Sequence, residues 1–258
     1  MVEFLTSLGL SSYASKISVL LFDGTIDTFY MVFLATAISI IVGVPLGVIL
    51  LVTSKGYFWY SPVFYSVLGS IVNALRSIPF IILMVAIIPI TKFFVGKSIG
   101  TTAAIVPLTI STIPFLGRLV ETSLRTVSYG LIEAAQSMGA SPFRIIRKVL
   151  LPEALPELIQ NFTLTVIVII GCSAMAGTIG GGGLGDIAIR YGYQRFQVSI
   201  MVLTVIILIL MVQLTQLVGD YLTKKVDHRK YFIRNIFKKE NTFYVSFFIV
   251  IIAISYKC

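Results

Sequence analysis

Charged residues are scarce in this chain, because they make up only 12% of its 258 residues. Soluble domains carry about 25% charged residues, so a soluble enzyme or binding module is excluded. Hydrophobic residues reach 57%, and the mean hydropathy is +0.98. The composition therefore predicts an all-α integral membrane protein without a separate soluble domain.

Histidine and cysteine are rarer still. His228 is the one histidine, and Cys172 and Cys258 show no paired spacing. Ser–His chemistry and histidine metal sites within the membrane are therefore excluded, and no disulfide framework follows. Cys172 lies in an apolar stretch and is interpreted as a small buried hydrophobic residue. We expect no catalytic residue, no metal and no cofactor bound by this chain.

Acidic residues are absent from the middle of the apolar stretches, since Glu121, Asp186 and Asp220 lie at their ends. Ion-coupled carriers usually place a carboxylate within the membrane as the handle for a proton or sodium ion. A secondary carrier is therefore the weaker alternative among transport functions, and an intramembrane enzyme is weaker again.

Two glycine motifs resemble nucleotide-binding loops without completing them. The segment 180–185 contains G-x-G-x-x-G, but it follows an apolar stretch rather than a strand. Gly96-Lys97-Ser98 resembles the end of a P-loop, yet Thr91 stands where the first glycine belongs. Neither motif predicts nucleotide binding. The glycines of 180–185 either form a turn that shapes the mouth of a pathway or allow close helix packing.

Five apolar stretches are long enough to cross about 30 Å of hydrocarbon. They comprise residues 29–53, 62–90, 99–117, 158–179 and 198–222. We therefore expect an N-terminal segment 1–25 without a removable signal peptide, a transmembrane domain 26–222, and a tail 223–258. The tail contains a 15-residue apolar stretch, 242–256, which is either a sixth, thin span, a surface segment or sequence without function.

Basic residues give the chain a net charge of +9 and also an orientation. Seven of them lie between residues 224 and 239, and four between 125 and 148. Both groups flank apolar stretches, as the positive-inside rule expects of cytoplasmic segments. We therefore predict a multi-pass protein of the bacterial cell membrane with its N-terminus outside. The bilayer, not nucleic acid, is the partner of this charge.

Residues 133–152 read EAAQSMGASPFRIIRKVLLP and predict a polar helix pair outside the bilayer. Residues 131–138 can form two helical turns, which Gly139 stops in the left-handed conformation. Ser141 and Pro142 suit the N-cap and first position of a second helix, which Pro152 closes. The apolar face of this second helix comprises Phe143, Ile145, Ile146, Val149 and Leu150.

The helix pair resembles the cytoplasmic EAA loop, here residues 123–156, with which ABC-importer permeases dock on their ATPase. The matching residues are Glu133, Ala134, Ala135, Gly139, Val149, Leu151 and Pro152. The resemblance implies a separate ATPase that holds ATP and Mg²⁺, with the two alanines admitting a partner's backbone. An ordinary amphipathic loop helix is the alternative, but it does not account for the Ala-Ala-x3-Gly start.

Three further stretches are similar to methionine ABC-importer permeases. They are residues 76–83, residues 113–121, and residues 173–186 followed by Tyr191-Gly192-Tyr193. The resemblance implies the type I ABC-importer permease fold, a homodimer, two ATPase subunits and a substrate-binding lipoprotein outside. It also implies a path for methionine, with both enantiomers as candidates. An ABC permease for another small polar solute is the alternative.

Three residues are candidates for the pathway or its gate. Arg76 lies midway along an apolar stretch, where an ionised group costs about 2.5–3.5 kcal/mol unless it is solvated or paired. It either reaches an interface because Pro79 bends the helix, or it lies beside a water-filled path. Ser173 and Met175 belong to a run of small and polar residues that favours either the path or close packing.

Overall fold

The computed structural model describes residues 12–227, and all of its regular elements are helical. They are α2 (Ser12–Thr53), α3 (Pro62–Ser77), α4 (Phe80–Ala86), α5 (Ile88–Val95), α6 (Thr101–Arg125), α7 (Tyr129–Ser137), α8 (Pro142–Ile145), the π-helix η1 (Ile146–Leu150), α9 (Leu151–Glu153), α10 (Leu155–Gly177), α11 (Gly183–Ile187), the π-helix η2 (Ala188–Tyr193) and α12 (Val198–Val226). The segment 242–256 and most of the basic tail lie outside these residues.

Four of these helices, α2, α6, α10 and α12, are long and apolar enough to cross a membrane. A fifth span is obtained when α3 and α4, which meet at an angle of 100°, are counted together. The sequence predicted a bend at Pro79, and the stretch 62–90 is divided there between α3 and α4. The chain breaks at Ile78 because the ring of Pro79 pushes the preceding residue into extended backbone, with φ −80° and ψ 123°.

The helices extend beyond the apolar stretches that predicted them. Helix α2 begins at Ser12, so part of the expected N-terminal segment 1–25 is helical. Helix α6 continues to Arg125, past the predicted end at residue 117. Hydropathy marks the part of a helix that lies in hydrocarbon, whereas backbone hydrogen bonds continue the helix beyond it.

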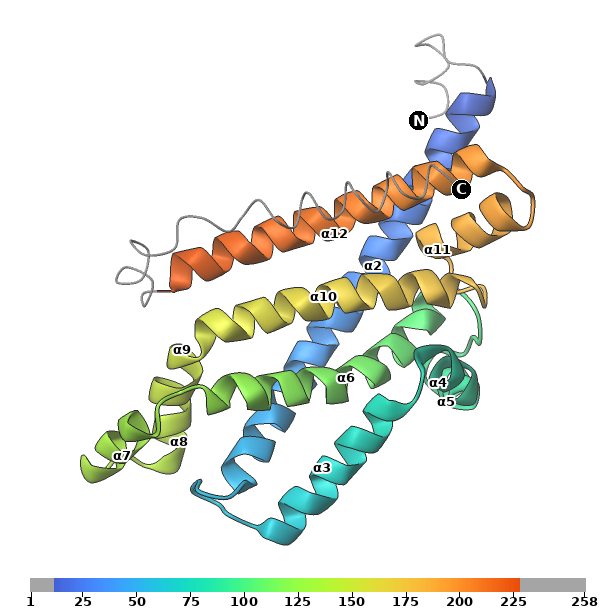
Figure 1. The fold of residues 1–258 in the computed structure, drawn as a ribbon. Coiled ribbons are helices and arrows are strands. Elements are labelled where there is room, and N and C mark those ends of the chain that lie inside the picture. Colours follow the sequence, from blue (N-terminus) through green and yellow to red (C-terminus); the bar gives the residue numbers. More distant parts are fainter. Residues whose placement is uncertain (1–11, 228–258) are drawn as a thin grey trace, which may run out of the picture.

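Helix α2 crosses the helices α6, α10 and α12, and it packs most extensively against α6 (Figure 1). The contact forms where Gly43 faces Leu116, and where Gly47 faces the carbonyl oxygen of Gly117 and the side chain of Val120. A Cβ atom at Gly47 would lie 2.5 Å from that oxygen. The Gly43-x-x-x-Gly47 spacing therefore allows the two helix backbones to approach closely.

Glycines at the end of α10 and in α11 allow these two helices to pack closely. A side chain at Gly177, in the last turn of α10, would overlap the backbone of Gly185 in α11. The α11 backbone is also tied to α2, because the Leu184 N–H donates to the Thr28 hydroxyl over 2.8 Å. Of the two interpretations of 180–185, close helix packing therefore holds at this contact, while three positive φ angles at Gly180, Gly182 and Gly183 also form a turn.

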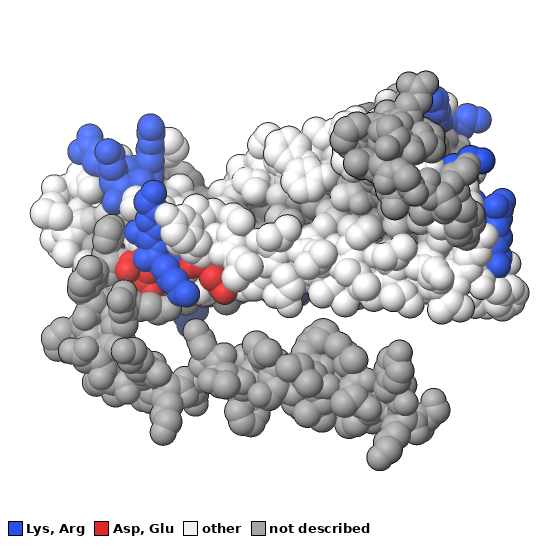
Figure 2. All heavy atoms as spheres, turned by 90° about the horizontal axis from the view of Figure 1, so that it is seen from above, with Lys and Arg blue, Asp and Glu red and all other residues white. Residues whose placement is uncertain are grey.

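On the face that Figure 2 shows, charged side chains gather at the two ends of the bundle, with an uncharged band between them. The helix pair α7–α9 lies at one end, where α12 also finishes (Figure 1). Helix α11 and the start of α2 lie at the other end. The described chain therefore begins and finishes on opposite sides of the band, as an odd number of crossings requires.

Candidate docking site and membrane cavity

Helix α7 ends in the turn that the sequence predicted. Gly139 has φ +77°, in the left-handed region. Its N–H donates to the Gln136 carbonyl over 2.8 Å, and the Ala140 N–H donates to the Ala135 carbonyl over 3.1 Å. These two bonds define a Schellman motif, which satisfies carbonyls that the end of a helix leaves free. The chain direction after α7 is therefore set by Gly139.

The second helix of the pair differs from its prediction in two respects. Ser141 stands at the N-cap of α8, but its side chain makes no capping hydrogen bond. The helix does not close at Pro152, because helical backbone continues through η1 to Glu153. Pro152 has no N–H to donate, and the π-helical turn of η1 just before it accommodates that missing donor.

The apolar face of the second helix is buried except at one edge. Ile145, Ile146 and Leu150 are buried, and Val149 is half-buried. Phe143, by contrast, is 68% exposed, although the sequence placed it on the same apolar face. At 100° per residue Phe143 lies at the edge of the apolar arc, and in the first turn it projects beyond the core.

The buried residues of the helix pair belong to one cluster, here called the docking core. It joins α7, through Ile132 and Ala135, to α6, α10 and the end of α2. The docking core comprises Leu51, Val52, Leu116, Val120, Leu124, Val127, Ile132, Ala135, Ile145, Ile146, Leu150, Ala154 and Leu158. Tyr57 packs against it, and burial raises the pKa of this phenol, which stays neutral at physiological pH.

Four of the seven residues of the predicted docking pattern are exposed: Glu133, Ala134, Gly139 and Pro152. Ala135 is 5% exposed and belongs to the docking core, against which Val149 and Leu151 also pack. The pattern therefore combines surface positions with positions that hold the helix pair on its own subunit.

Two exposed apolar side chains beside the pattern were not predicted as part of this surface. Met138 is 81% exposed at the end of α7, and Phe143 is 68% exposed at the start of α8. Both lie close in sequence to the turn at Gly139.

The docking core is bracketed by polar contacts between α6 and α10. The Asn161 amide donates to the Ser123 hydroxyl over 2.6 Å, and the Thr126 hydroxyl donates to Glu157 over 2.7 Å. Both contacts join the segment just before the helix pair to the segment just after it. The ends of α6 and α10 that flank the helix pair are therefore tied to each other.

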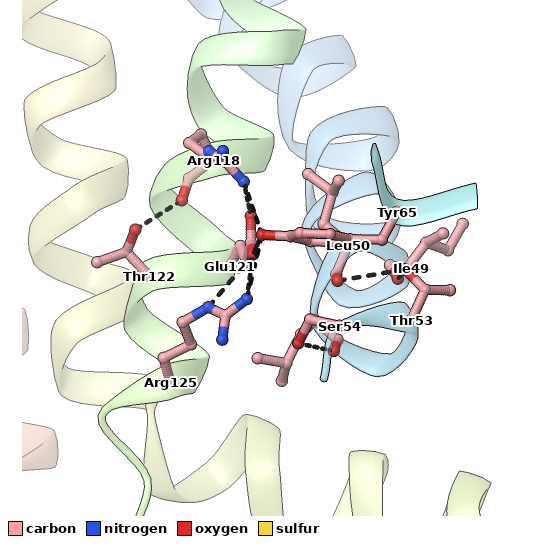
Figure 3. A network of polar contacts seen from close by, with 10 residues as sticks. Ile49, Leu50, Thr53, Ser54, Tyr65, Arg118, Glu121, Thr122 and Arg125 are labelled. Carbon is pink, nitrogen blue, oxygen red and sulfur yellow. Dashed lines mark hydrogen bonds and ion pairs between the residues drawn. The ribbon is translucent and has the colours of Figure 1, made fainter. Parts of the chain in front are cut away.

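An ionic network beside the docking core joins α6 to α3 (Figure 3). Glu121 is 2% exposed and pairs with Arg118 and, over 2.7 Å, with Arg125. The Tyr65 hydroxyl of α3 donates to Glu121 over 3.0 Å and accepts a bond from Arg125 over 3.3 Å. The spacing Arg-x-x-Glu-x-x-x-Arg was visible in the sequence, but the contact with Tyr65 was not.

A cavity of about 540 Å³ lies between α3, α4, α6 and α10. Arg76, in the last turn of α3, lines it, and its guanidinium carbon lies 5.8 Å from the centre of the Phe115 ring. Asn73, Leu75, Ser77, Ile78, Phe80, Ser111, Thr112, Val168 and Cys172 complete the lining. The thiol of Cys172 therefore borders the cavity, whereas the sequence predicted a merely buried hydrophobic residue.

The other two pathway candidates do not line this cavity. Ser173 is 1% exposed, and its hydroxyl donates to the Ile170 carbonyl over 2.7 Å. Met175 is 47% exposed. Of the three candidates, the structure brings only Arg76 to the cavity.

Membrane-length helices with a capped helix pair at one charged end define a helical membrane protein that crosses the bilayer several times. Residues 43–230 match the family described as the binding-protein-dependent transport system inner membrane component, and the chain belongs to this family. Its fold is the type I ABC-importer permease fold. The predicted fold class is confirmed.

Relatives and solved structures match over most of this chain. A Vibrio cholerae protein named "Probable D-methionine transport system permease protein MetI" is 56% identical, over 81% of this chain and 93% of its own. The "Methionine import system permease protein MetP" of Bacillus subtilis is 43% identical, over 81% and 94%. A structure titled "Inward facing conformations of the MetNI methionine ABC transporter" has a TM-score of 0.81 at 44% identity, over 82% and 98%.

Proposed function

We propose that this chain is the permease subunit of an ATP-driven importer of methionine, in both enantiomers. The observation that carries the proposal is the exposed, Schellman-capped helix α7, seated on a core shared with α2, α6 and α10. An element placed in this way can pass a partner's movement into three long helices. The substrate is proposed from relatives named for methionine transport that cover four fifths of this chain.

The partner at α7 is an ABC ATPase subunit, which holds ATP and Mg²⁺. Its contact surface on this chain comprises Glu133 and Ala134 of α7, the turn at Gly139, and the protruding side chains of Met138 and Phe143. Exposed apolar side chains supply desolvated contact area, and Glu133 supplies a polar contact at the rim. The end of the bundle that carries α7 is then cytoplasmic, and the start of α2 lies outside.

The working unit is a homodimer with two ATPase subunits and a substrate-binding lipoprotein outside. A two-fold axis normal to the membrane presents two α7 helices to two ATPases and leaves a path between the two permease copies. ATP draws the ATPases together, the docking cores follow, and the path opens toward the binding protein. Hydrolysis reverses the movement and releases the substrate inward.

Uptake by proteoliposomes that contain the permease, its ATPase and its binding protein tests the substrate. We expect labelled methionine to accumulate, and unlabelled methionine of either enantiomer to compete with it. Other amino acids should compete weakly. Accumulation of a phosphonate or sulfonate without accumulation of methionine would contradict the assignment.

A further inference from the structure

The cavity beside Arg76 has the size and depth of a site within the membrane. Its volume of about 540 Å³ falls within the ~300–1,000 Å³ of small-molecule pockets. Pro62 begins α3, and the rise of a helix places Arg76 about 21 Å along its axis. Arg76 therefore stands within the α3–α4 pair, which together is long and apolar enough to cross a membrane, rather than at the end where α3 starts.

Arg76 has no carboxylate partner within the described residues, unlike the three arginines that form ion pairs there. Arg118 and Arg125 share Glu121, and Arg190 pairs with Asp186. Within residues 12–227 no acidic side chain pairs with Arg76, whose guanidinium instead lies over the Phe115 ring. A charged group at this depth usually pairs or lies on a substrate path, so this guanidinium is available to an anionic ligand.

The hydroxyl groups of the cavity are occupied by their own helices. Ser77 donates to the Asn73 carbonyl over 2.8 Å, and Ser111 and Thr112 both donate to the Leu108 carbonyl. The donors that remain for a ligand are the Arg76 guanidinium and the Asn73 side-chain amide. Phe115, Val168 and Cys172 form an apolar wall facing these groups.

We propose that this cavity is a transient station for the transported amino acid, with Arg76 binding its α-carboxylate. The planar guanidinium donates two parallel hydrogen bonds to a carboxylate. The Asn73 amide oxygen accepts from the α-ammonium, and the thioether lies against the Phe115 ring, a favourable sulfur–aromatic contact. The inference rests on the proposed import of methionine and adds the residues that hold the substrate on its way through.

Cys172 makes the station measurable, because its thiol lines the same cavity. In the complete transporter carrying Cys258→Ser, modification of Cys172 by a small thiol reagent is followed with increasing methionine. We expect methionine to slow the modification. Methioninamide, which lacks the carboxylate, should require about tenfold or higher concentrations for equal protection, because a charge-assisted hydrogen bond is lost. Both ligands are compared on the same protein, so a change of Arg76 is not needed to see the difference.

Substitutions of Arg76 and of a control arginine show whether the discrimination between methionine and methioninamide depends on Arg76. Arg76→Gln should abolish the difference between methionine and methioninamide, and Arg76→Lys should retain part of it. Arg195→Gln is the matched control, because Arg195 also lies over an aromatic ring, that of Tyr191 at 4.8 Å, but outside the cavity. In this control variant, methionine should slow the modification of Cys172 as much as it does in the parent protein.

Equal protection by methionine and methioninamide, or unchanged protection in Arg76→Gln, would overturn the role of Arg76. Absence of protection in a complex that still accumulates methionine would overturn the station and leave the import function standing. A complex that accumulates no methionine would overturn the proposed function itself.

Discussion

Gly139→Val should reduce methionine uptake to background while the permease still inserts into the membrane. Residue 139 has φ +77°, a conformation that costs a β-branched residue about 1–3 kcal/mol. No atom lies within 4 Å of a Cβ at this position, so the effect arises from the backbone and not from a clash within the chain. The measurement is uptake, together with ATP hydrolysis stimulated by the loaded binding protein.

Gly139→Asn is the matched control, since asparagine tolerates the left-handed region far better than valine. It should keep the Schellman turn and most of the uptake. Uptake by Gly139→Val at the level of the parent, in an assembled complex, would show that the turn is not part of the ATPase contact.

Glu121→Ala should lower the thermal stability of the purified permease more than the removal of any exposed charge. Glu121 is 2% exposed and is the shared anion of Arg118 and Arg125. Hydrogen bonds to charged groups contribute about 1.5–3 kcal/mol each. Because the arginine side chains are 27% and 40% exposed, water compensates part of this loss, and we expect a total of about 2–3 kcal/mol. The measurement is the melting temperature in detergent.

Two variants separate the parts of the ionic network. Tyr65→Phe keeps both arginine pairs and removes the hydroxyl through which α3 bonds Glu121 and the arginines, so it should cost about 1 kcal/mol. Asp220→Ala removes a surface hydrogen bond to Gln216 on α12 and should leave the melting temperature nearly unchanged. A Glu121→Ala protein that melts with the parent would show that the network does not hold α3 against α6.

Local signals predicted the docking turn, because the conformation of a helix end depends on a few consecutive residues. Gly139 after two helical turns was enough to predict the left-handed residue that the structure contains. The same reasoning recognised Ile145, Ile146 and Leu150 as a buried face. It failed for Phe143, which lies at the edge of the apolar arc. It also failed at Pro152, because the π-helix η1 just before it accommodates the missing N–H donor and the helix continues.

Features that depend on distant residues could not be derived from the sequence. Tyr65 and Glu121 are 56 positions apart, and no periodicity connects them. Pro79 predicted a bend or break after α3, but the angle of 100° between α3 and α4 depends on how both helices pack against the rest of the chain. The sequence indicated Arg76 as a candidate because charged residues are scarce in the apolar stretches. It could not predict the cavity around Arg76, because residues of α3, α4, α6 and α10 line it together.

The central claim is that this chain carries methionine with energy from a separate ATPase that contacts α7. The most direct test compares methionine uptake by proteoliposomes under two energy sources. In one, ATP is available to the ATPase; in the other, an ion gradient is imposed without ATP. We expect methionine accumulation with ATP and none with a proton or sodium gradient alone, and loss of accumulation when the ATPase subunit is omitted. Accumulation driven by the gradient in the absence of ATP and ATPase would contradict it and identify a secondary carrier.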